Sequence, residues 1–189
     1  MSGIGHNNGP TMDRGAGWRR YAWKRARADL LPKMPIEVVR RRVKRARELG
    51  LDYKAYAGIR AATGRDVIAL LFSSNALNLM RDARAAPDRA AYLADLRQTK
   101  LLSLVHPPFD PISVLERNKV LDAAAKAPGV FVPWSETRRR VLELKGNLPS
   151  DGIVVIGETQ LEREWSEAGR LAGYVDAARY FGLPDDATF

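Results

Sequence analysis

Four short apolar runs constrain the fold of this chain more than any other feature of its sequence. They are VIALLF at 67–72, LLSLV at 101–105, VFV at 130–132 and IVVI at 153–156. Alternating apolar and polar residues would indicate a strand with one face in water, whereas continuous β-branched runs favour strands buried on both faces. Helical patterns follow three of the runs, at 75–80, 136–144 and 160–172. Because strands that alternate with helices form parallel sheets, the sequence predicts an α/β domain with a small, mostly parallel sheet and flanking helices.

The first run allows an alternative, in which Asp66 caps a helix that continues to Met80.

Helical periodicity precedes the predicted sheet. Apolar residues at 36, 39, 43, 46 and 49 recur at spacings of three and four, which predicts a helix over 36–49 that Gly50 ends. Asp52 is placed to cap a second helix over 53–63, which Gly64 ends. An earlier helix is expected over 18–31. The predicted organisation is a flexible Gly-, Asn- and Pro-rich tail at 1–17, a basic helical region at 18–65 and the α/β domain at 66–189.

The positive charge of the chain is concentrated in this helical region. Residues 1–66 contain 16 Lys and Arg against 6 Asp and Glu, whereas residues 67–189 contain 15 against 16. Such a segment is typical of a surface that binds a polyanion such as nucleic acid, although a solvated helix face without a partner has the same composition. The residues predicted to contact nucleic acid are Arg19, Arg20, Lys24, Arg25, Arg40, Arg41, Lys44, Arg45, Arg47 and Lys54.

The helix pair over 36–63 is similar to a helix-turn-helix motif, which places its second helix in the major groove of DNA. Here most of the charge lies on the first helix, and the second contains only Lys54 and Arg60. The sequence therefore favours contacts to phosphates over the reading of base edges. The aromatic residues at 18, 21 and 23 either stack on unpaired bases or pack their helix against the domain.

Polar residues follow the predicted strands, at the sheet edge where open parallel sheets bind ligands. Helix N-termini at this edge also attract anions, which predicts a small polar pocket for a phosphate-bearing ligand. The alternative is that these residues only cap helices and form turns, with Ser135 and Thr159 as N-caps. The residues of the predicted pocket are Ser73, Ser74, Asn75, His106, Ser135, Glu158 and Thr159.

The sequence contains few signatures of an enzyme. It has no cysteine, so thiol chemistry, disulfides and cysteine-bound zinc are excluded. It also contains no glycine-rich dinucleotide motif, no phosphate loop and no HExxH helix. His106 is the one histidine outside the tail, and no partner for it is evident in the sequence. We therefore predict no catalytic residue, no metal site and no cofactor.

No apolar run approaches the roughly 18 residues that a membrane-spanning helix needs. The first residues also lack the basic start and apolar core of a secretory signal. A cytoplasmic protein that does not bind membranes is therefore expected.

Two local resemblances accompany these patterns. The segment VIGETQLERE at 155–164, with Ala168 and LAG at 171–173, resembles the last motif of haloacid dehalogenase-like phosphatases. That resemblance implies that Glu158 and Glu162 support a metal ion. Those enzymes also need an aspartate nucleophile after their first strand, and the matching segment FSSNA at 72–76 contains no aspartate. The opening GIGHNNGP, with residues 35–77, resembles an uncharacterised family of bacterial proteins, which implies no mechanism.

Three functions fit these observations. The first is binding of nucleic acid, with DNA expected before RNA, by a protein whose α/β domain is a non-catalytic scaffold or sensor. The second is an enzyme, or a degenerate enzyme, that acts on a phosphorylated small molecule at the strand ends. The third is an adaptor whose basic helices bind an acidic protein. The oligomeric state stays open.

Overall fold

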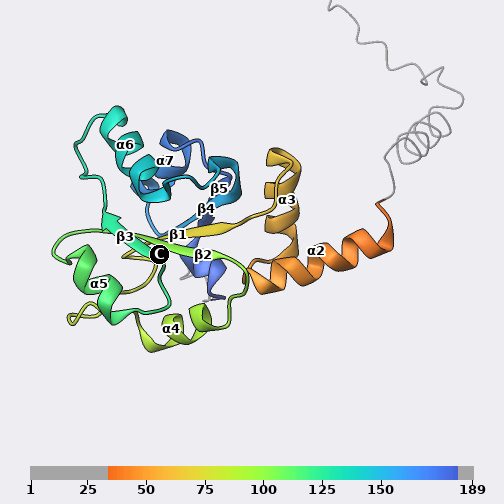
Figure 1. Cartoon of the computed structure of the whole chain (residues 1–189), viewed down its shortest axis with the longest axis horizontal. Helices are drawn as coiled ribbons and strands as arrows, with labels where there is room; N and C mark the ends of the chain where they lie inside the picture. Colours follow the sequence, from red (N-terminus) through yellow and green to blue (C-terminus); the bar gives the residue numbers. More distant parts are fainter. Residues whose placement is uncertain (1–33, 183–189) are drawn as a thin grey trace, which may run out of the picture. The chain divides into compact units, whose positions relative to one another are not determined.

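A parallel sheet forms the centre of the α/β domain, as predicted. The computed structural model describes residues 34–182, and the sheet belongs to the compact unit that begins at Arg40. Its five strands lie in the order β3-β2-β1-β4-β5 and every neighbouring pair is parallel (Figure 1). The strands are β1 (Ala69–Ser73), β2 (Lys100–Val105), β3 (Ala123–Lys126), β4 (Ile153–Gly157) and β5 (Gly173–Asp176).

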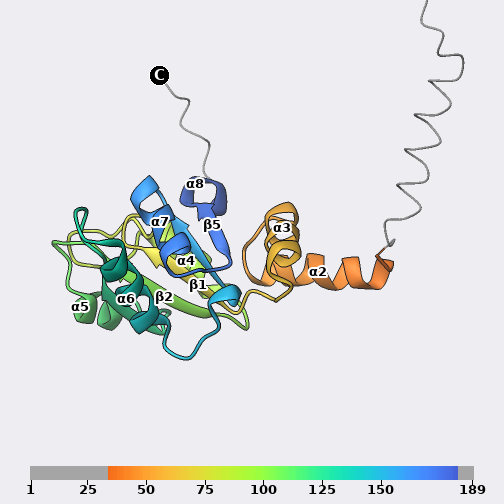
Figure 2. The ribbon, with the colours of Figure 1, turned by 90° about the horizontal axis from the view of Figure 1, so that it is seen from above.

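Helices cover both faces of this sheet, as Figures 1 and 2 show. One face packs against α4 and α5, and the other packs against α6 and α7. The helices are α2 (Ile36–Glu48), α3 (Tyr53–Thr63), α4 (Pro87–Ala94), α5 (Pro111–Arg117), α6 (Trp134–Lys145), α7 (Gln160–Ala168) and α8 (Ala177–Tyr180), with a short 3-10 turn η1 (Ser150–Gly152) before β4.

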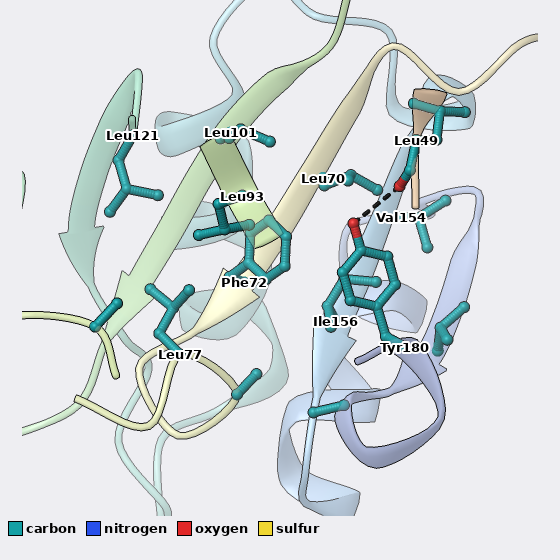
Figure 3. Close-up of a cluster of buried hydrophobic side chains, with 14 of the residues drawn as sticks. Leu49, Leu70, Phe72, Leu77, Leu93, Leu101, Leu121, Val154, Ile156 and Tyr180 are labelled. Atoms are coloured by element: carbon teal, nitrogen blue, oxygen red, sulfur yellow. Dashed lines mark hydrogen bonds between the residues drawn. The ribbon is translucent and has the colours of Figure 1, made fainter. Parts of the chain in front are cut away.

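The central strands bury both rows of their side chains. In β1, Leu70 and Phe72 enter the larger core, whereas Ala69 and Leu71 enter the core on the opposite face. Figure 3 shows the larger core, in which the Tyr180 hydroxyl donates a hydrogen bond of 2.9 Å to the carbonyl of Leu49. Three of the four apolar runs, at 67–72, 101–105 and 153–156, thus correspond to strands that have no face in water.

The two predicted helices before the sheet form with the expected ends. The backbone amide of Ala55 donates to the Asp52 side chain at 2.8 Å, which caps α3, and Gly64 ends α3 in the left-handed conformation. Gly50 also has a positive φ of 66°, so α2 ends and α3 begins within a short turn. Ala46 and Leu49, at the end of the predicted apolar stripe of α2, are fully buried.

Several predicted elements are wrong. Residues 130–132 form no strand, because Val130 and Phe131 lie in an exposed turn, and Phe131 is 99% exposed. The third strand is instead β3, whose sequence AAAK has little of the β-branched character typical of strands. The segment 75–80 forms turns rather than a helix, and Asp66 caps no helix there because β1 follows it.

The predicted helix over 160–172 is shorter than expected, since α7 ends at Ala168 and β5 begins at Gly173. The prediction also omitted α4 and α5, each of which begins with a proline at its first turn, a position that proline favours. Within residues 34–182, no helix has the length and hydrophobicity that crossing a membrane requires.

Candidate functional site

The strand order places β1 next to β4, although two strands separate them in the sequence. The chain therefore builds the sheet outward from β1 in one direction and then in the other. In open parallel sheets, ligands bind at the carboxyl ends of the strands beside such a switch point. The loops after β1, β2 and β4 meet at this edge, and they contain most of the residues predicted for the pocket.

A buried carboxylate, Glu162 in the first turn of α7, connects these loops. It has no solvent exposure. Its Oε1 accepts a hydrogen bond from the Asn75 amide at 2.8 Å and lies 3.1 Å from Nε2 of His106. Its Oε2 accepts from the backbone amides of Glu158 and Thr159, at 2.6 and 3.1 Å. Glu162 therefore links the ends of three neighbouring strands.

These hydrogen bonds determine the charge of Glu162. Burial alone would raise the pKa of its carboxyl, but the hydrogen bonds from His106 and the two backbone amides outweigh burial and hold the pKa below its usual value. Because an ionised carboxylate only accepts hydrogen bonds, Nε2 of His106 carries a proton and donates it. The sequence showed no partner for His106, and the fold supplies one 56 residues later along the chain.

The predicted hydroxyl residues hold the loops together. The Ser73 hydroxyl accepts from the amide of Ala76 at 3.0 Å, and the Ser74 hydroxyl accepts from the amide of His106 at 3.0 Å. Both serines are buried. Thr159 is the N-cap of α7 and forms a capping box with Glu162, which confirms the capping interpretation at this position.

Ser135 and Glu158 lie outside this network of side-chain contacts to Glu162. Ser135 is an exposed residue of α6, whose N-cap is Pro133, so the prediction that Ser135 caps this helix is wrong. Glu158 is an exposed residue, but neighbouring atoms partly shield its carboxyl from water. This desolvation and the charge of Glu162 raise the pKa of Glu158.

The phosphatase resemblance implies that Glu158 and Glu162 support a metal ion, but Glu162 is occupied by hydrogen bonds. Both oxygens of Glu162 already accept two hydrogen bonds each. A carboxylate has about four lone-pair positions, so none is left for a cation. Among residues 34–182, no group of three or more His, Asp or Glu side chains is arranged to hold a metal ion.

A buried arginine, which no sequence pattern indicated, lies at the same edge. Arg89, in the first turn of α4, is 4% exposed, and its Nε and Nη1 atoms donate no hydrogen bond. Its guanidinium lies 3.9 Å from the ring centroid of Phe181, which follows β5 and α8. Its Nε lies 3.5 Å from the carboxylate of Asp88, whose side chain is 64% exposed.

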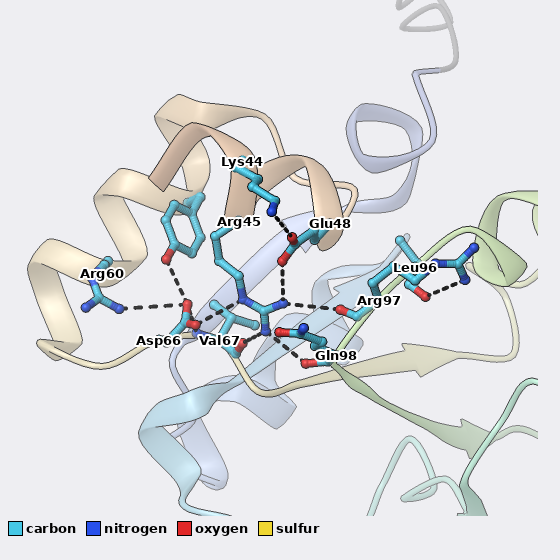
Figure 4. Close-up of polar contacts among 10 residues, drawn as sticks. Lys44, Arg45, Glu48, Arg60, Asp66, Val67, Leu96, Arg97 and Gln98 are labelled. Carbon is cyan, nitrogen blue, oxygen red and sulfur yellow. Dashed lines mark hydrogen bonds and ion pairs between the residues drawn. The ribbon is translucent and has the colours of Figure 1, made fainter. Parts of the chain in front are cut away.

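The opposite edge of the sheet contains a second enclosed arginine, Arg45 of α2, whose side chain is 13% exposed. Its guanidinium reaches the segments that lead into β1 and β2, and Figure 4 shows these contacts. It donates to the Asp66 carboxylate at 3.0 Å, to the carbonyls of Val67, Gln98 and Arg97 at 3.0, 2.9 and 3.2 Å, and to the Glu48 carboxylate at 3.3 Å. Arg45, predicted to contact nucleic acid, thus fastens α2 to the sheet.

The remaining predicted cations of α2 face outward. Arg40, Arg41, Lys44 and Arg47, here called the basic stripe, are exposed, and Lys54 is exposed at the start of α3. Lys44 lies 3.9 Å from Glu48, and within the described part of the chain no ion pair engages Arg41 or Arg47. Arg19, Arg20, Lys24 and Arg25 lie outside the described residues, as do the predicted tail and first helix.

Comparison with known proteins adds no assignment: no protein-family model matches the chain, and no curated protein or solved structure is significantly similar to it.

Proposed function

We propose that this protein binds nucleic acid through the basic stripe of α2, with Lys54 of α3 beside it. The observation that supports the proposal most is that the cations of α2 differ in exposure and in their contacts with the sheet. Arg45 is enclosed and bonded to the start of the sheet, whereas the four residues of the basic stripe remain exposed. The exposed Arg41, Lys44 and Arg47 are therefore available to a ligand, whereas Arg45 is not.

The stripe has a geometry that suits a phosphate backbone. Arg40, Lys44 and Arg47 recur at spacings of four and three, so they lie along one side of the helix, opposite the buried Leu49. At about 1.5 Å per residue the stripe extends for about 10 Å, which is long enough to reach neighbouring phosphates. The weak pair between Lys44 and Glu48, at 3.9 Å on an exposed surface, does not neutralise it.

The second helix of the pair supports phosphate binding more than base reading. Of its two cations, Lys54 is exposed, whereas Arg60 lies 3.8 Å from the carboxylate of Asp66. Tyr56 of the same helix is buried, and its hydroxyl donates to Asp66 at 2.7 Å. One side of α3 is thus turned toward the sheet, which leaves few side chains for sequence-specific contacts. Binding is expected to depend on charge rather than on sequence.

Fluorescence anisotropy with labelled duplex DNA and RNA over a series of salt concentrations tests this proposal. With about four phosphate contacts, log K for duplex DNA is expected to fall against log salt with a slope of about −3.6. The triple variant R41E/K44E/R47E should lose binding at low salt. A matched control, R81E/R117E/K119E, changes the net charge equally at exposed positions of another surface and should retain most of the affinity.

The two variants also separate the proposal from its alternatives. Equal loss of binding in both would show that only net charge matters, and affinity without salt dependence would exclude phosphate contacts. Tighter binding to a polyglutamate peptide than to either nucleic acid would favour an adaptor for acidic proteins.

A further inference from the structure

Arg89 is in an unusual physical state for a buried cation. It is 4% exposed, and two of its three guanidinium nitrogens are enclosed without a hydrogen-bond acceptor. Removing a charged group from water is costly unless a counter-charge or hydrogen bonds replace the water. Because buried polar groups in proteins nearly always have partners, the missing acceptors call for an explanation.

The neighbours of Arg89 within the described residues do not supply those acceptors. The ring of Phe181 stacks on the guanidinium but offers only its π face. The Asp88 carboxylate is 3.5 Å from Nε, too far for a hydrogen bond, and its side chain is mostly exposed. Glu158 interacts electrostatically with Arg89, but within the described residues no ion pair joins the two side chains.

The first turn of α4, to which Arg89 belongs, adds a second source of positive potential, although it also contains the acidic Asp88. The N-cap of this eight-residue helix is Ala86, which makes no side-chain capping hydrogen bond, and Pro87 occupies the first helical position. The amides of an uncapped first turn have no acceptor within the helix, and the helix dipole favours an anion beside them. The guanidinium and the helix end therefore favour the same kind of ligand.

We propose that Arg89 and the first turn of α4 form a binding site for the oxyanion group of a small molecule, a carboxylate or a phosphate, at the carboxyl edge of the sheet. The planar guanidinium matches both groups, since it can donate two parallel hydrogen bonds to two oxygens. Phe181 fixes the plane of the guanidinium by stacking. The site differs in position and chemistry from the basic stripe of α2, and it does not rest on the proposal for nucleic acid.

Glu158 limits which ligands fit beside Arg89. Its carboxyl belongs to the same edge, and partial burial and the nearby Glu162 raise its pKa. The rest of the ligand would meet this carboxyl and the aromatic ring of Phe181, so we expect a small organic acid or phosphate ester rather than a polymer.

Isothermal titration calorimetry of the full chain with inorganic phosphate and with acetate tests this site, with sodium chloride at equal ionic strength as the reference. We expect saturable binding of at least one anion by the wild type. R89M should weaken this binding at least tenfold. R89K, which keeps the charge but not the paired N–H donors of the guanidinium, should weaken it less. R84M, which removes an exposed arginine of the segment before α4, should bind as the wild type does. Circular dichroism establishes that each variant is folded.

Three results would overturn the proposal. The first is absence of saturable binding in the wild type, and the second is equal weakening in R84M and R89M, which would indicate adventitious binding to surface charge. The third is binding that occurs only in the variant D185N/D186N, which removes two carboxylates of the chain outside the described residues. That result would mean that the chain's own carboxylates occupy the site. If R89M does not fold, R89K against R84M decides between these outcomes.

Discussion

The two edges of the sheet each contain an arginine shielded from water, and these two arginines differ in their hydrogen bonding. At the amino edge, Arg45 donates hydrogen bonds to two carboxylates and three carbonyls. At the carboxyl edge, Arg89 is more deeply buried, yet Nε and Nη1 have no acceptor. The Arg45 side chain therefore stabilises the fold at one edge, whereas the Arg89 side chain keeps unused hydrogen-bond donors at the other. The guanidinium with unsatisfied donors thus lies at the edge where parallel sheets bind their ligands.

The carboxyl edge is itself divided between structure and binding. Glu162 is saturated with donors from Asn75, His106 and two backbone amides, so the loops around it are held in place. Arg89 reaches the same edge from α4 without joining this network. We infer that the Glu162 network is the rigid support, and that Arg89 is the group that meets a ligand.

The largest effect should come from breaking the amino edge. R45M removes the five hydrogen bonds that this guanidinium donates to two carboxylates and three carbonyls, and their combined loss should cost about 3–5 kcal/mol. R47M, two positions along the same helix, alters an exposed side chain and should change the free energy of unfolding by less than about 0.5 kcal/mol. Urea unfolding followed by circular dichroism measures both. Similar values for the two variants would show that Arg45 does not fasten α2 to the sheet.

A smaller but still large effect is expected from E162Q at the carboxyl edge. The side-chain NH2 group of glutamine donates hydrogen bonds, and in E162Q it would face neighbouring groups that also donate. The free energy of unfolding should therefore fall by about 2–3 kcal/mol. E167Q, an exposed position of the same helix, is the matched control.

The pH dependence of E162Q gives an independent check. The folded-state pKa of Glu162 is lowered from 4.5, so its ionised form stabilises the fold above that pH. This contribution should be lost as the pH falls from 4.5 through the lowered pKa, and the difference between wild type and E162Q should shrink over that range. A difference independent of pH would mean that the carboxylate charge is not what connects the loops.

The parts of this architecture that the sequence predicted are those encoded locally. Continuous apolar runs predicted β1, β2 and β4, and Asp52 and Gly64 predicted the ends of α3. The edge strands β3 and β5 escaped prediction because they are four residues long and need to bury little. Conversely, the apolar run at 130–132 resembled a strand but lies in an exposed turn.

The site was predictable only in outline, for a related reason. The rule that parallel strands end at one edge brought Asn75, His106 and Glu158 into one prediction. The contacts that organise the edge join residues 87 and 56 positions apart, and no local pattern shows that Glu162 is their common partner. The unpaired state of Arg89 depends on what surrounds it after folding, so an arginine in an ordinary helix sequence does not reveal it.

The most direct test of the contrast between the two arginines is the free energy of unfolding of R89M, measured by urea titration in buffer free of phosphate and carboxylates. If Arg89 is held for an external oxyanion, replacing this buried charge, whose Nε and Nη1 have no hydrogen-bond acceptor, with an apolar side chain of similar length should leave stability within about 1 kcal/mol of the wild type. In the same experiment, R45M should lose several times more free energy of unfolding than R89M. A loss in R89M as large as the loss in R45M would contradict the account, because Arg89 would then be a structural part of the fold.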